Sequence, residues 1–136
     1  DKQFDLVMLH IGGNDIVRFT SIDDFTNSID TVFKLATNIS DEVTITVTGN
    51  MGTATLFPYG TGWLLEKRTR QVHQIISDTA QAYNSHYIDL FLERDEDPFL
   101  TEPTKYYAKD LFHPSGAGYA LWFKQISKQL NTINLN

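Results

Sequence analysis

Two side chains near the end of the chain have the types and the spacing of an acid–base pair. Asp110 and His113 lie three positions apart in the segment DLFHP, 110–114. Because a proline follows His113, this residue is biased away from helical geometry and is expected on a turn, just before a helix that Ser115 would cap. There the carboxylate can hold one ring nitrogen as a donor and leave the other free to accept a proton. The pair predicts a general base; a capping aspartate beside a surface histidine is the alternative interpretation.

A second polar group follows the first apolar run of the chain. The run at 4–11 ends in Gly12-Gly13-Asn14-Asp15. Two glycines at the end of a strand let the backbone turn sharply and admit a ligand close by. Asn14 would then present an amide over that space, which suits an oxyanion. The alternative is a turn in which Asn14 and Asp15 bind their own backbone.

The elements that must position these residues alternate along the chain. Apolar runs predict three buried strands, at 4–11, 42–49 and 85–92. Helical spacing of apolar residues predicts three helices, at 21–39, 63–84 and 115–130. A strand followed by a helix, three times over, predicts an α/β fold with a parallel sheet.

The first strand is expected to be both apolar and at an edge. Flavodoxin-like sheets have the strand order 2-1-3-4-5. If the strands of this chain are the third, fourth and fifth of such a sheet, the run at 4–11 lies beside an absent strand and becomes an exposed apolar edge. We therefore expect something to cover that edge.

Two long connections, 49–62 and 93–113, begin at the carboxyl ends of strands, where open parallel sheets place their binding crevice. The first of them carries Phe57, Tyr59 and Trp63. These rings could wall an apolar acyl or aryl pocket, or pack beneath the helix that follows. A further ring, His10, lies within the first apolar run and is expected in the core.

Composition narrows the class of function. The chain has 136 residues, which fits one domain over 1–136, and its formal net charge is −6. It holds no basic run that would indicate nucleic-acid binding and no apolar stretch of membrane-spanning length. The absence of cysteine excludes disulfides, thiolate catalysis and cysteine-based metal sites. No metal or cofactor is implied, although His113, Asp110 and a loop acid such as Asp95 or Asp97 could form a metal site.

Taken together, the two motifs resemble the SGNH (GDSL) hydrolase family. IGGND closes a central strand and DLFHP precedes the last helix. The resemblance runs from Phe4 to the final helix and implies a flavodoxin-like three-layer α/β/α sandwich with a Ser-Asp-His esterase or lipase-type mechanism. It places Gly12 and Asn14 in the family's G-x-N-D block, with the Asn14 amide as an oxyanion-hole donor. It makes Asp110 the orienting acid and His113 the general base, while Gly13 serves the turn and Asp15 is structural.

The family's nucleophile is missing from the chain. It sits in a Gly-Asp-Ser block on the first strand, and a second glycine donor follows the second strand; neither block is present. Every serine of the chain lies outside such a context: Ser21, Ser28, Ser40, Ser77, Ser85, Ser115 and Ser127. The resemblance therefore implies the C-terminal portion of a hydrolase, without its first one or two βα units and inactive alone.

Two hypotheses follow. In the first, the chain belongs to a carboxylic-ester hydrolase that acts on a small acyl or acetyl ester, with the serine supplied by an absent N-terminal segment or by a separate chain. In the second, the chain is a non-catalytic flavodoxin-like module whose exposed edge docks a partner strand. A Gly-Asp-Ser block in sequence upstream of residue 1, or in a second polypeptide, would favour the first.

Overall fold

Three parallel strands form one sheet in a computed structural model that describes residues 2–58 and 60–133. The strands follow one another across the sheet in chain order: β1 (Val7–His10), β2 (Val43–Thr46) and β3 (His86–Ile88). Each is shorter than the apolar run that predicted it. In the register Val7 lies opposite Val43, and Thr46 lies opposite Ile88.

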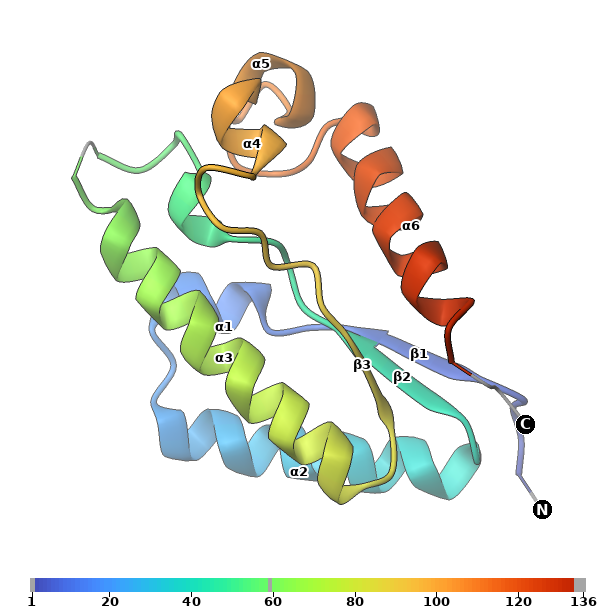
Figure 1. The fold of residues 1–136 in the computed structure, drawn as a ribbon. Coiled ribbons are helices and arrows are strands. Elements are labelled where there is room, and N and C mark those ends of the chain that lie inside the picture. Colours follow the sequence, from blue (N-terminus) through green and yellow to red (C-terminus); the bar gives the residue numbers. More distant parts are fainter. Residues whose placement is uncertain (1, 59, 134–136) are drawn as a thin grey trace.

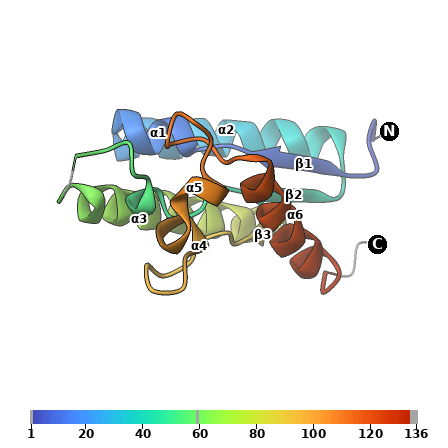
Figure 2. The same ribbon diagram turned by 90° about the horizontal axis from the view of Figure 1, so that it is seen from above.

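Helices cover both faces of this sheet and make the predicted α/β/α layers (Figures 1 and 2). Helices α2 (Ile22–Ile39) and α3 (Gly62–Ala82) lie on one face, and α6 (Gly116–Leu130) lies on the other. All three begin and end within two residues of their predicted limits. No helix in the described part of the chain is long and apolar enough to cross a bilayer.

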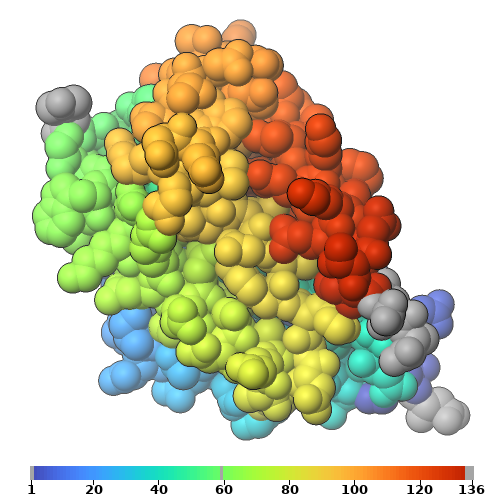
Figure 3. Space-filling model, in the orientation of Figure 1, coloured from blue at the N-terminus to red at the C-terminus, as the bar shows by residue number. Residues whose placement is uncertain are grey.

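Four short helices gather at the carboxyl ends of the strands, in segments expected to be turns or loops (Figure 1). They are α1 (Gly13–Arg18), the 3₁₀ helix η1 (Met51–Thr53), α4 (Pro98–Thr101) and α5 (Pro103–Tyr106). Elements of three to six residues are too short to show helical periodicity, which is why the pattern missed them. Figure 3 shows the segment after β3, yellow to orange, running between α3 and α6.

The main core lies between the sheet and the pair α2 and α3. All four residues of β2 are buried, and Phe33 of α2 and Ile76 of α3 pack in the same cluster. A smaller core around Phe99 and Tyr107 joins the segment after β3 to α6. The N-termini of α2 and α6 follow from the sequence, because Ser21 and Ser115 cap these helices as predicted.

β1 is an edge strand, as predicted, but it is not buried on both faces. Within the described residues it pairs with β2 alone. Val7 and Leu9 pack against the main core, whereas Met8 is 44% exposed and His10 is also exposed. Successive side chains of a strand point to opposite faces, and the face of β1 that carries Met8 and His10 is only partly covered. The expectation that His10 lies in the core is therefore wrong.

The edge makes a testable prediction about association. An unpaired apolar edge offers backbone N–H and C=O groups to another strand. We expect residues 1–136, expressed alone, to associate with rising concentration, and Met8→Lys to shift the chain toward monomer. Leu35→Lys is the matched control, because Leu35 is 62% exposed but lies on helix α2 and not on the edge strand. Light scattering after size exclusion measures both; a wild-type chain that stays monomeric at all concentrations would contradict the prediction.

Candidate active site

Asp110 and His113 form a hydrogen-bonded pair. Nδ1 of His113 lies 2.7 Å from Oδ2 of Asp110. The other oxygen, Oδ1, accepts the backbone N–H groups of Phe112 and His113 at 3.1 and 2.9 Å. These contacts, the imidazole first, hold the pKa of the Asp110 carboxyl below its usual range, so it is an ionised acceptor. The ring proton therefore resides on Nδ1, and Nε2 is left as the basic nitrogen.

A tight turn brings the two side chains together. Leu111, between them, has φ of 60°, in the left-handed region that non-glycine residues rarely occupy. Its N–H donates to the carbonyl of Ala108 at 2.9 Å, and the N–H of Ala108 donates to the carbonyl of His113 at 2.7 Å. An antiparallel bridge between Tyr107 and Pro114 closes the turn at its base. The surrounding backbone contacts thus hold a strained residue in place.

The pair opens onto a crevice of about 400 Å³ at the carboxyl end of β1. Six residues considered in the sequence analysis line it: His10, Gly12, Gly13, Asn14, Asp15 and His113. Asp110 lies outside the lining, behind His113. The chain thus brings together two motifs that are about a hundred residues apart in sequence.

The two glycines are required by the way β1 turns into α1. Gly12 has φ of 96°, which L side chains rarely adopt. A Cβ on Gly13 would lie 2.7 Å from Cγ2 of Thr48, on the neighbouring strand end. This close approach places Asn14 in the first turn of α1, where its amide has no hydrogen-bond partner among the described residues. Asp15 instead accepts a hydrogen bond from the Thr20 hydroxyl at 2.9 Å.

Rings for which the sequence predicted no role in the site also wall the crevice. The ring of His10 lies 5.7 Å from that of Trp122, and the ring of Tyr119 lies 5.9 Å from the same ring. Partial burial lowers the pKa of the His10 imidazole. The sequence did offer one indication that His10 lies at the crevice. Met8 and His10 are two positions apart in a strand, so their side chains share the partly exposed face of β1.

The aromatic residues expected to wall a substrate pocket lie elsewhere. Phe57 and Trp63 line a separate hollow of about 610 Å³, bordered by Arg94 and Leu100. The Phe57 ring also packs edge-on against Phe112, with centroids 5.8 Å apart, behind the crevice wall. Tyr59 lies outside the described residues.

No serine lines the crevice in the described part of the chain. Ser115, two residues after His113, is used as the cap of α6: its Oγ accepts the N–H groups of Ala117 and Gly118, both at 3.2 Å, and donates to the carbonyl of Lys105. Over the same described ranges, no three histidine or acidic side chains are arranged to hold a metal ion, so Asp95 and Asp97 form no such cluster with the pair.

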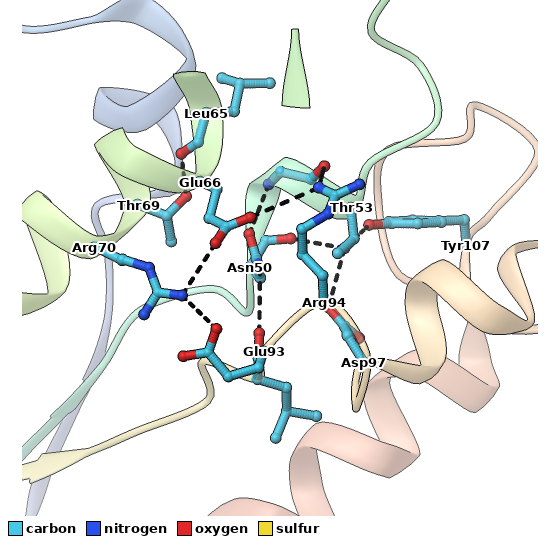
Figure 4. Close-up of polar contacts among 12 residues, drawn as sticks. Asn50, Thr53, Leu65, Glu66, Thr69, Arg70, Glu93, Arg94, Asp97 and Tyr107 are labelled. Carbon is cyan, nitrogen blue, oxygen red and sulfur yellow. Dashed lines mark hydrogen bonds and ion pairs between the residues drawn. The ribbon is translucent and has the colours of Figure 1, made fainter. Parts of the chain in front are cut away.

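Buried polar contacts tie the loops around the crevice to one another (Figure 4). The Thr53 hydroxyl, after β2, lies 3.0 Å from Oδ2 of Asp97 and 3.1 Å from the hydroxyl of Tyr107. Asn50 donates its amide to the carbonyl of Leu92 at 3.2 Å. The loops after β2 and β3 are thereby held against the base of the turn that carries His113.

An outer layer of charged contacts supports the same loops. Arg94 donates to the carbonyl of Gly52 at 2.7 Å and lies 3.7 Å from Glu66 of α3. Arg70 pairs with Glu66 at 3.0 Å and with Glu93 at 2.5 Å (Figure 4). These pairs are partly exposed, so we expect them to contribute less than the buried hydroxyl contacts.

The family follows from a comparison with family models. The model of the GDSL-like lipase/acylhydrolase family matches residues 1–121, which include Asn14 and the Asp110–His113 pair. The chain belongs to this family. No curated protein matches the chain significantly. The flavodoxin-like α/β sheet that the resemblance implied agrees with the three parallel strands of this GDSL-family chain.

The packing of Gly118 gives this GDSL-family site a testable constraint. A Cβ there would lie 2.4 Å from the carbonyl oxygen of Tyr106 and 2.9 Å from Cβ of Pro114, at the base of the His113 turn. We expect Gly118→Ala to lower the free energy of unfolding by about 1–3 kcal/mol through overpacking. Gly116→Ala is the control, because nothing lies within 4 Å of a Cβ at Gly116. Urea unfolding compares the two; equal effects would contradict the close approach.

Proposed function

We propose that this GDSL-family chain supplies the base and the oxyanion donor of a carboxylic-ester hydrolase, and that the nucleophilic serine comes from a Gly-Asp-Ser block outside residues 1–136. The observation that carries the proposal is the 2.7 Å contact between His113 and Asp110, with the ring opening onto the crevice that Asn14 also lines. A carboxylate-oriented imidazole beside an unpartnered amide is what acyl transfer by a serine requires.

In the proposed reaction, Nε2 of His113 takes the proton of the serine hydroxyl as its oxygen attacks the ester carbonyl carbon. The carbonyl oxygen becomes an oxyanion, which the Asn14 amide stabilises by donating a hydrogen bond. Asp110 stabilises the imidazolium. His113 then gives its proton to the departing alcohol, and a water molecule, activated by the same nitrogen, releases the acyl group and frees the serine.

The uncovered edge of β1 gives the serine-bearing segment a place to pack. Met8 is exposed on β1, and Leu6, just before the strand, is 37% exposed. β1 ends at the crevice, so a strand added beside it would also end there, and its following turn could present a serine to His113. The segment could precede this chain in one polypeptide or belong to a separate chain.

The crevice supports a small ester as the substrate. Its volume is about 400 Å³, and it is walled by the rings of Tyr119 and Trp122. The hollow beside Phe57 and Trp63 is separate, so those residues are proposed to serve a larger acyl or alcohol group only if the substrate extends beyond the crevice.

Removing the base tests the mechanism. With a Gly-Asp-Ser segment present, we expect His113→Ala to abolish turnover of a short-chain aryl ester, because the serine keeps its proton. His86→Ala is the control, since His86 begins β3 at the opposite end of the sheet. Residues 1–136 alone should show no turnover. Ester hydrolysis that survives His113→Ala would refute the assignment, and a reconstituted wild type without turnover would favour the binding-module hypothesis.

Removing the amide tests the oxyanion donor. We expect Asn14→Ala to lower kcat by about 10²–10³ with a much smaller change in KM, because the amide acts only on the developing oxyanion. Asn27→Ala, on the exposed face of α2, is the matched control. A change confined to KM would assign Asn14 to substrate binding instead.

A further inference from the structure

One buried hydroxyl has three oxygen neighbours. Oγ1 of Thr53 lies 2.8 Å from the carbonyl oxygen of Asn50, 3.0 Å from Oδ2 of Asp97 and 3.1 Å from the hydroxyl of Tyr107. Thr53 is 2% exposed, Asp97 3% and Tyr107 7%, so water does not screen the cluster (Figure 4). Each contact between two oxygens at these distances is attractive only when a proton lies between them.

A count of the protons favours a carboxyl that supplies one of them. A hydroxyl has one proton and two lone pairs. The Asn50 carbonyl can only accept, so the proton of Thr53 points to it, and the Tyr107 hydroxyl donates to one lone pair. The third contact then lacks a proton unless Asp97 carries it.

We propose that Asp97 is a protonated carboxylic acid that donates to Thr53 and thereby acts, through Tyr107, as a positioning residue for the Asp110–His113 pair. An ionised Asp97 would compete with the Asn50 carbonyl for the single proton of Thr53. The two buried contacts would then share one proton, and each would be weaker than a full hydrogen bond.

Burial of Asp97 acts in the direction of the protonated form. Burial raises the pKa of its carboxyl, against the N–H of Phe99, the Thr53 hydroxyl and the charge of Arg94, which lower it. Arg94 is itself engaged by the Gly52 carbonyl and by Glu66. Burial also raises the pKa of Tyr107 to about 12, so its hydroxyl keeps its proton.

The link from Asp97 to the pair is short and continuous. Tyr107 bridges to Pro114 at the base of the turn, and that turn holds Asp110 and His113 between its two ends. Asp97 and Tyr107 line a small void of about 20 Å³ whose other walls include Phe112, Pro114 and Trp122. Phe112, Pro114 and Trp122 also line the crevice. A shift of Tyr107 therefore reaches the crevice wall directly.

Two substitutions of Asp97 separate a neutral donor from an ionised acceptor. Asn replaces the acid with an uncharged group that still donates to Thr53 and accepts from Phe99, whereas Ala removes both contacts. We expect Asp97→Asn to keep the urea midpoint of the wild type or to raise it, and Asp97→Ala to lower it. An Asp97→Asn midpoint lowered as far as that of Asp97→Ala, at every pH from 4 to 8, would overturn the protonated form.

The pH dependence has a defined sign. The folded carboxyl has the higher pKa, so its contribution to stability is present below the unfolded pKa and is lost as the pH rises through the folded value. Asn cannot ionise, so this loss is absent from Asp97→Asn. The urea midpoint of Asp97→Asn should therefore rise relative to that of the wild type as the pH increases above about 4. A difference that moves the other way would show an ionised Asp97.

The positioning role is tested at His113 itself, by long-range ¹⁵N–¹H correlation of its ring. We expect one Nδ1–H tautomer in the wild type and in Asp97→Asn, and mixed or broadened signals in Asp97→Ala. Tyr107→Phe, which removes only a hydroxyl, should broaden them too and serves if Asp97→Ala does not fold. Unchanged His113 signals in Tyr107→Phe would overturn the role. The positioning role rests on the proposed function, because only that function gives the Asp110–His113 pair a task. The urea midpoints and the His113 signals need no serine and no turnover, so their failure is distinct from a failure of ester hydrolysis.

Discussion

The contact of the Thr53 hydroxyl with Asp97 and Tyr107 is the interaction on which the geometry of the site depends. It joins the loop after β2, the segment after β3 and the strand-like stretch that leads into the His113 turn. Each of these segments is long and contributes little regular structure of its own. Because the contact is buried, leaving any partner unsatisfied costs free energy, and the three segments are held in one arrangement.

The contact between Asp110 and His113 is too weak to fix the positions of the two side chains by itself. The two side chains are 52% and 64% exposed, and an ion pair or hydrogen bond at such exposure contributes little to stability. The turn that carries the pair fixes its geometry. That turn is held by the left-handed backbone of Leu111, by the bridge between Tyr107 and Pro114, and by the close packing of Gly118 against its base. An exposed pair on a buried support keeps the His113 ring open to the crevice.

Local patterns predicted the parts of the fold that depend on local chemistry. Helix α2 follows from the Ser21 cap and the apolar spacing that buries Phe25, Ile29 and Phe33. The G-x-N-D and D-x-x-H motifs pointed to Asn14 and His113, which meet in one crevice. What the sequence could not show depends on long-range packing. His10 looked buried because a strand pattern does not say which face is covered. Phe57 and Trp63 line a hollow separate from the crevice, and their loop is held by the contact of Arg94 with the Gly52 carbonyl, which no local pattern shows.

The central claim is that this chain holds a serine-activating half-site. Its most direct test is covalent labelling of a Gly-Asp-Ser-bearing βα segment of a GDSL-family hydrolase by a fluorophosphonate, read by intact mass with and without residues 1–136. Phosphonylation of a serine requires that its proton be removed, so the account predicts one adduct, on that serine, only when residues 1–136 are present and only with His113 intact. Labelling that proceeds equally without this chain or with His113→Ala, or no labelling of the assembled pair, would contradict it.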